Sequence, residues 1–77
     1  MIKKALEFKG LKPLGRRLQK LRMKSGLSAR AVGRELGVAG TTITRWENGE
    51  IEPRLAYIIY WIEKHEADPY WLLFGVE

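Results

Sequence analysis

Glycine closes four of the five short apolar-periodic stretches in this sequence, and this punctuation restricts the chain to short helices. The first stretch has four leucines at steps of three or four residues, Leu11, Leu14, Leu18 and Leu21, with basic and polar residues between them. This spacing lines one face of a helix, and glycine is favoured just after a helix end because it readily adopts positive φ. A first helix is therefore predicted over 13–25, entered through Pro13 and closed by Gly26.

The same pattern predicts four more helices, so the expected fold class is all-α. Ser28 is a good N-cap for a second helix that runs to Leu36 and ends at Gly37. A third helix is predicted over 40–48 and a fourth over about 54–65, and Asp68-Pro69 provides an N-cap and a first-turn proline for a short fifth helix over 70–74. The expected core residues of the third and fourth helices are Ile43, Trp46, Leu55, Ile58, Ile59 and Ile62.

Charge is distributed unevenly along the chain. Residues 1–46 contain twelve Lys and Arg against two acids, whereas residues 47–77 contain two against seven. The first part carries a formal charge of +10 and the second carries −5. This asymmetry suits a polyanion bound on one side of the molecule, although a basic surface that serves only solubility would give the same charges.

Missing residue types narrow the range of functions. The chain has no cysteine and one histidine, so disulfides and thiolate metal sites are excluded. There is no P-loop glycine pattern and no evident pair of catalytic acids, so we expect no enzyme, no metal and no cofactor. No stretch approaches the roughly 20 apolar residues of a membrane span, and the start lacks the apolar core of a signal peptide. We expect a cytoplasmic protein with no membrane partner.

Residues 14–53 carry the motif that points to function. They contain Leu14-Gly-x-x-Leu-x-x-Leu-Arg, Gly26-Leu-Ser, Leu36-Gly-Val, Thr42-Ile-Thr-Arg-Trp-Glu-Asn-Gly and Pro53. This pattern resembles the lambdoid phage repressor and Cro (XRE-type) family of helix-turn-helix proteins, and the segment from His65 to Gly75 looks like the closing segment of many phage-type repressors. The resemblance implies a compact five-helix, lambda-repressor-like DNA-binding domain whose second and third helices form the helix-turn-helix.

The resemblance also implies which residues read DNA bases. The outward positions of the third helix fall on Gly40, Thr41, Thr42 and Arg45. A guanidinium can bind guanine O6 and N7 together, a contact worth ~1 to 3 kcal/mol of discrimination, and threonine methyl groups can contact thymine methyl groups. Arg45 is therefore the main candidate for base recognition, with the third helix in the major groove of double-stranded DNA.

A second set of residues is expected to contact phosphates. In the family, the positions of Arg22 and Glu47 often hold a partly buried ion pair that joins the first helix to the third and aims the arginine near a phosphate. An ordinary exposed pair is the alternative. The full set of expected phosphate contacts, which includes the N-terminus of the second helix, is Arg17, Arg22, Ala29, Arg30, Thr44, Asn48 and Arg54.

Several positions depart from the family pattern. Ala29 replaces the usual glutamine that clamps a phosphate, and Ala39 replaces a capping serine or threonine. Gly40 offers no side chain to a base, and Glu50 and Glu52 put acid in a loop that is commonly basic. These departures predict a sparse recognition surface and weaker binding to the DNA backbone at that loop.

The C-terminal part is rich in aromatic residues, which either complete the core or form an interface. One core of this size can hardly hide all of them together with the aliphatic residues, and aromatic residues are favoured at interfaces. A two-fold dimer through the last two helices would place two recognition helices ~34 Å apart, opposite the halves of an imperfect palindrome. The residues expected at this interface are Tyr57, Tyr60, Trp61, Tyr70, Trp71 and Phe74.

The sequence therefore predicts two parts and one leading function. Residues 1–12 form a basic N-terminal arm or a short helix, and residues 13–77 form the helix-turn-helix domain with its dimerisation segment. The leading function is a dimeric phage-type or prophage transcriptional repressor that reads a palindromic operator. The alternative is an antitoxin or adaptor whose aromatic face binds a protein partner and which binds DNA for autoregulation. An RNA target is disfavoured because no exposed aromatics stand among the basic residues of the first three helices.

Overall fold

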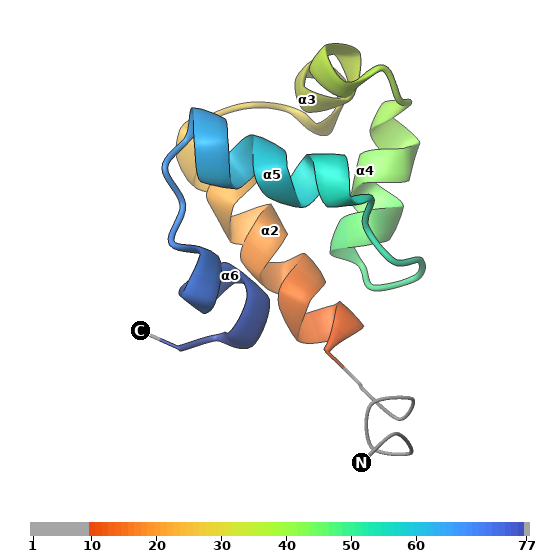
Figure 1. Cartoon of the computed structure of the whole chain (residues 1–77). Helices are drawn as coiled ribbons and strands as arrows, with labels where there is room; N and C mark the ends of the chain where they lie inside the picture. Colours follow the sequence, from red (N-terminus) through yellow and green to blue (C-terminus); the bar gives the residue numbers. More distant parts are fainter. Residues whose placement is uncertain (1–9, 77) are drawn as a thin grey trace.

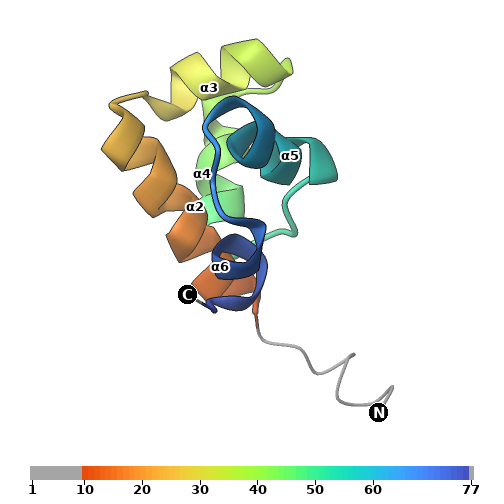
Figure 2. The same cartoon turned by 60° about the vertical axis from the view of Figure 1, so that its left-hand side comes forward.

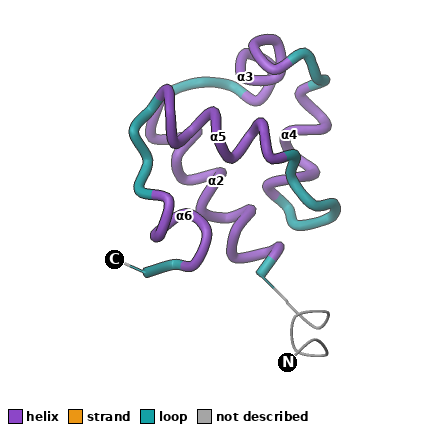
Figure 3. The backbone as a smooth tube through the Cα atoms, in the orientation of Figure 1, coloured by secondary structure: helices purple, strands orange, loops and turns teal. Residues whose placement is uncertain are grey.

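The computed structural model describes residues 10–76, and within that range the chain forms five helices and no strand (Figure 1, Figure 3). The predicted all-α class and the five predicted helices are confirmed. Most of the expected N-terminal arm, residues 1–9, lies outside the described residues. The helices are α2 (Leu11–Ser25), α3 (Ala29–Leu36), α4 (Gly40–Glu47), α5 (Leu55–Lys64) and α6 (Pro69–Phe74).

The helix ends follow the local chemistry of the sequence. Ser28 Oγ accepts a hydrogen bond from the Ala31 amide at 3.0 Å, and Asp68 Oδ1 accepts one from the Tyr70 amide at 2.9 Å. Both are N-caps that satisfy an amide in the first turn of a helix. Gly37, which follows α3, has φ of 75°, a backbone conformation that costs glycine little. The predicted caps of α3 and α6 are confirmed.

The start of α2 differs from the prediction. The helix begins at Leu11, two residues before the expected start at Pro13. Its first intrahelical hydrogen bond runs from the Leu14 amide to the Gly10 carbonyl oxygen at 2.8 Å. Proline is tolerated at the third helical position because the first-turn amides have no intrahelical acceptor in any case.

The helices pack around one core. α5 runs across α2 and α4, and α6 lies alongside α2 (Figure 1, Figure 2). Leu18 from α2, Val32 from α3, Ile43 from α4 and Leu72 from α6 are fully buried, so all of these helices contribute to the same core. The remaining buried hydrophobic residues are Trp46, Tyr57, Ile58, Tyr60 and Trp61.

The buried face of α5 corrects the sequence interpretation. Leu55 and Ile59, expected in the core, are 70% and 39% exposed, whereas Tyr57 and Trp61 are 0% and 1% exposed. The helix is apolar around nearly its whole circumference, so periodicity could not select the inner face. Packing against Trp46 of α4 determines the inner face instead. The ring centroids of Trp46 and Tyr57 are 5.2 Å apart, within the range of favourable aromatic contacts.

Candidate nucleic-acid interface

α3 and α4 are joined by a tight turn that depends on close backbone contact. The Val38 amide donates to the Gly33 carbonyl oxygen at 2.8 Å. A Cβ placed on Gly33 would lie 2.5 Å from the Val38 carbonyl oxygen, so a side chain at this position would push the two helices apart. The small residue therefore fixes how α4 is presented relative to α3.

α4 has an inner and an outer face. Ile43, Trp46 and Glu47 are buried, whereas Thr41 and Arg45 are exposed. A single exposed helix that carries small polar side chains and an arginine has the shape and hydrogen-bonding groups that a DNA major groove admits. The predicted inward residues Ile43 and Trp46 are confirmed. Arg45 lies exposed on the outer face, and its base-reading role stays a prediction.

Two of the other expected base-reading residues, Thr42 and Gly40, are less exposed than Arg45. Thr42 is only half-buried and lies on the same helix. Gly40 faces α3 rather than the outside, because a Cβ there would lie 3.1 Å from the Arg30 Cα atom. The expectation of Gly40 as a base-reading residue is corrected on this point: α4 begins close against the backbone of α3, where a side chain would be tightly packed.

The N-terminus of α3 lies beside the start of α4. Arg30 is exposed and, together with Arg34, lines a shallow groove whose far side is formed by residues 38–41. Ala29 is half-buried and packs against the core, so only its backbone amide is left to meet an anion. This end of α3 therefore presents basic side chains next to the outer face of α4, as expected of a phosphate contact.

Arg22, Glu47 and Tyr57 form a buried polar network that joins α2, α4 and α5. Glu47 accepts hydrogen bonds from Arg22 Nε at 2.8 Å, from Arg22 Nη2 at 2.9 Å and from the Tyr57 hydroxyl at 2.7 Å, and its side chain is 0% exposed. Arg22 Nη1 also donates to the Leu27 carbonyl oxygen at 3.1 Å. Arg22 and Glu47 therefore form the partly buried ion pair that the family resemblance implies, and not an ordinary exposed pair. Tyr57 is a third member of the network, which the sequence did not predict.

This network shifts the ionisation of its members. Its hydrogen bonds to Glu47 raise the pKa of the Arg22 guanidinium. Burial, assisted by the hydrogen bond to Glu47, raises the pKa of the Tyr57 hydroxyl. Arg22 is therefore held as a cation and Tyr57 as a neutral donor. Because three of the five N–H groups of Arg22 bind protein atoms, its first role is to hold α4 against α2.

Arg17 is turned away from the proposed DNA side. Its Nε donates to the Leu72 carbonyl oxygen at 2.7 Å and its Nη2 to the Leu73 carbonyl oxygen at 3.3 Å. The guanidinium thereby satisfies carbonyl groups near the C-terminus of α6, where the helix dipole favours a cation. The expected phosphate contact at Arg17 is corrected, because the side chain ties α6 to α2.

The three remaining expected phosphate contacts are exposed and differ in their partners. The Thr44 hydroxyl donates to the Thr41 carbonyl oxygen at 2.9 Å within α4. Asn48 donates from Nδ2 to Glu50 Oε2 at 3.3 Å, so an acid of the following loop engages it. Arg54 occupies the N-cap position of α5. Each of these residues is accessible, and the Asn48 amide has a second N–H besides the one that Glu50 accepts.

Half of the expected dimer interface belongs to the core. Tyr57, Tyr60 and Trp61 are buried within the chain, so the expectation that they form an interface is wrong. The Tyr60 hydroxyl donates to Glu35 Oε1 at 2.6 Å, which ties α5 to α3. Of the expected interface residues, Tyr70 and Phe74 are exposed and Trp71 is half-buried. Exposed apolar side chains that were not predicted for the interface include Leu55, Ile59 and Val76.

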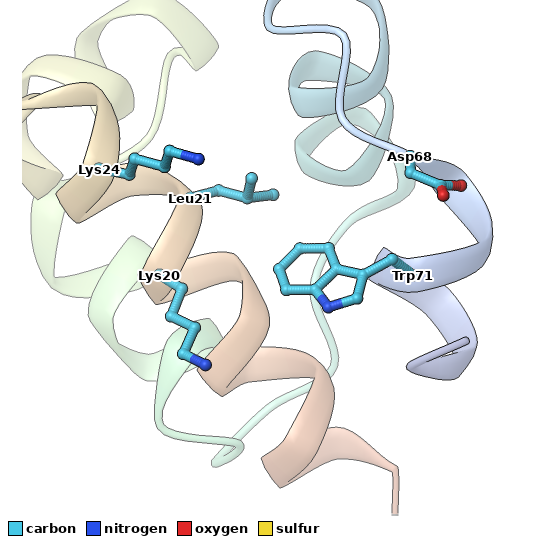
Figure 4. Close-up of a pocket in the computed structure, with 5 residues that line it drawn as sticks. All are labelled: Lys20, Leu21, Lys24, Asp68 and Trp71. Carbon is cyan, nitrogen blue, oxygen red and sulfur yellow. The ribbon is translucent and has the colours of Figure 1, made fainter. Parts of the chain in front are cut away.

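Among the further grooves that border α2, one is apolar and another is polar. Trp71 and Leu21 form the apolar part of a groove between α2 and α6, with Lys20, Lys24 and Asp68 around it (Figure 4). A more polar groove separates the N-terminal part of α2 from the turn after α4. Three residues of α2 line this second groove, Lys12, Arg16 and Gln19. Lys12 belongs to the predicted basic arm over 1–12, whereas Arg16 and Gln19 were not among the predicted sites, because only the fold shows that the two segments are neighbours.

Residues 10–76 contain neither a metal-binding cluster nor a membrane-spanning helix. Within this range no three His, Cys, Asp or Glu side chains come together in a way that could hold a metal ion. No helix of this part combines the length and the apolar character needed to cross a membrane.

Comparison with known proteins identifies a family for this chain. The profile of a helix-turn-helix domain family matches residues 13–69, which is most of the chain and includes α3, the turn and α4. Neither the curated proteins nor the solved structures contain a match.

Proposed function

The chain belongs to the helix-turn-helix domain family, which indicates a DNA-binding regulator, and we propose that it is a sequence-specific transcriptional repressor of the Cro and phage-repressor type. The observation that carries the proposal is the outer face of α4, which presents Thr41 and Arg45 on a helix fixed from behind by Ile43 and Trp46. In this proposal Arg45 reads guanine in the major groove and the threonines contact thymine. The protein acts as a binding protein and not as an enzyme, in the cytoplasm where its DNA target lies.

Phosphate contacts fix the register of α4 in the proposed complex. The exposed Arg30 beside the start of α4, the N-terminal amides of α3 and the accessible Asn48 and Arg54 flank the recognition helix. Contacts of this kind position a protein on the duplex without reading its sequence. The Arg22–Glu47 pair supports them indirectly, since it holds α4 against α2.

We propose further that the repressor is a homodimer. Apolar side chains that the fold leaves exposed support this: Leu55 at 70%, Tyr70 at 67% and Phe74 at 69%. Burying such residues against a second copy would remove apolar surface from water. A two-fold dimer would set two copies of α4 ~34 Å apart and require an operator with two related half-sites.

The test is a selection of duplexes from a random pool with the purified chain, followed by titration of the selected duplex with wild type and Arg45→Ala. The expected result is a palindrome with half-sites ~10 bp apart, and a loss of discrimination worth ~1 to 3 kcal/mol at one base position in Arg45→Ala. Lys20→Ala, which changes an exposed cation on the side of α2 that borders α6, is the control. If the selected duplexes share no sequence, the proposal of sequence-specific recognition is wrong.

One observation favours a second candidate, an antitoxin or adaptor that holds a protein partner. The groove between α2 and α6 is lined by Trp71 and Leu21 beside Lys20 and Lys24, and no residue of α4 lines it (Figure 4). In the repressor proposal a second copy of the chain covers the apolar surface, whereas in the adaptor proposal a different protein covers it. Sedimentation of the purified chain across a range of concentrations distinguishes them, because a saturated homodimer supports the repressor and a stable monomer supports the adaptor.

A further inference from the structure

The polar groove at the N-terminal part of α2 is continuous with the end of α4. Gly49, just after α4, lies against the first turn of α2: a Cβ on Gly49 would be 2.9 Å from the Lys12 Cα atom. The groove is formed by the side of α2 that faces this turn and by the turn itself. Its lining includes Lys12, Arg16, Gln19, Asn48, Gly49 and Glu50.

The acids of this groove have protein partners. Glu47, which also lines it, is buried against Arg22 and Tyr57, and Glu50 accepts a hydrogen bond from Asn48. Lys12 and Arg16 are exposed, and within residues 10–76 neither of them forms an ion pair. The charge of Glu47 is offset by Arg22, whereas Glu50 keeps its charge because Asn48 is neutral. Within residues 10–76, Lys12 and Arg16 therefore outnumber the one carboxylate of this groove that has no cationic partner.

The spacing of these cations suits a DNA backbone. Lys12 and Arg16 are four residues apart, which is about 6 Å along the helix axis. One strand of duplex DNA carries a phosphate every ~3.4 Å of its axis, so two flexible side chains at this separation reach nearby phosphates of the same strand. An open groove of this kind fits a chain of phosphates that passes over it better than a single enclosed anion.

We propose that Lys12, Arg16 and Gln19 form a strip on α2 that binds the DNA backbone beyond the C-terminal end of α4. The inference rests on the proposed DNA-binding function and extends the contact area past the helix-turn-helix. It also explains how the complex gains positive charge on this flank, where Glu50 and Glu52 of the adjacent loop repel phosphates. Gln19, half-buried between the two segments, provides a neutral amide donor to a phosphate oxygen.

The test compares two double variants of the same helix. Lys12→Gln with Arg16→Gln removes two charges from the strip, and Lys20→Gln with Lys24→Gln removes two charges from the side of α2 that borders α6. All four side chains are exposed, so both variants are expected to keep the fold, which circular dichroism checks. Binding of a selected operator duplex and of an unrelated duplex is measured by fluorescence anisotropy from 50 to 200 mM salt.

The strip variant is expected to reduce the slope of log affinity against log salt by about 2, and the control variant to leave it unchanged. Because salt changes fourfold over the series, the loss of affinity from 50 to 200 mM should shrink by roughly tenfold. The reduction should be the same on both duplexes, and base preference should persist, since phosphates carry no sequence information. Equal slopes for the two variants would overturn the inference.

Failure of the inference and failure of the proposed function give different results. If wild type binds both duplexes equally, the sequence-specific function is wrong, yet the two slopes still decide whether the strip contacts phosphate. If wild type binds neither duplex, both proposals fall. A second measurement does not depend on the salt series: shortening the duplex beyond the half-sites should weaken binding of wild type and of the control variant, but not of the strip variant.

Discussion

Replacement of Arg22 by methionine should destabilise the fold far more than loss of a surface charge. The Glu47 carboxylate is 0% exposed and takes two of its three hydrogen bonds from Arg22. Removing the guanidinium leaves a buried charge with only the Tyr57 hydroxyl as a partner, which costs ~3 to 5 kcal/mol. For a domain of this size, that corresponds to a decrease in Tm of at least ~12 °C.

The second substitution tests the reason for this cost. Glu47→Gln keeps the shape of the side chain and removes the charge, so it should lower stability in wild type, where it weakens the pair. In Arg22→Met the same substitution should raise stability, because it removes the unpaired buried charge. This reversal of sign is expected only if burial of the carboxylate dominates.

Urea unfolding followed by circular dichroism provides the four free energies of unfolding, and equal m-values would show that the same transition is compared. Arg16→Met, an exposed arginine on the same helix, is the control and should stay within about 0.5 kcal/mol of wild type. A cost below about 1 kcal/mol for Arg22→Met would mean that the pair behaves as a solvated one. A further loss on adding Glu47→Gln would refute the reasoning outright.

Three further predictions concern other contacts. Gly15→Ala should lower the free energy of unfolding by ~1 to 3 kcal/mol, although alanine favours helix, because its Cβ would lie 2.7 Å from the Trp46 carbonyl oxygen; urea unfolding beside the exposed control Lys20→Ala checks this. Arg17→Met should increase amide hydrogen exchange in α6 much more than in α4, because only α6 loses hydrogen bonds to its carbonyls; a uniform increase would contradict a local role. Burial and its hydrogen bond to Glu35 raise the pKa of Tyr60 to about 12 from an ordinary value of 10.0, so its contribution to stability is complete below pH 10 and is lost as pH rises through 12. Tyr60→Phe should reduce the fall in Tm across that window, the exposed Tyr70→Phe should not, and equal behaviour of the two would count against the assignment.

Local chemistry made the helices predictable. The sequence predicts Ser28 and Asp68 as N-caps, and Gly26 and Gly37 as helix ends, because the effects of these residues depend on neighbours within a few residues. The inner face of α4 was predictable for a related reason: threonines and an arginine alternate with Ile43 and Trp46, so only one face of the helix is apolar.

Contacts between distant segments were not predictable from the sequence. α5 is apolar on nearly all sides, so only packing against Trp46 decides that Tyr57 faces inward and Leu55 outward. Arg17 reaches carbonyls 55 and 56 residues away, and backbone acceptors leave no trace in a residue pattern. The strip on α2 depends in the same way on the contact between Lys12 and Gly49.

The two faces of α4 also matter for how such a protein changes over generations. Ile43, Trp46 and Glu47 hold the helix in place, while the side chains of Thr41 and Arg45 take part in no hydrogen bond or ion pair within residues 10–76. Substitutions at the outer positions therefore leave the core intact, and surface changes of this kind usually alter stability by less than about 0.5 kcal/mol. A copy of this gene could acquire a different operator through a few exposed residues, while every intermediate along the way remained folded.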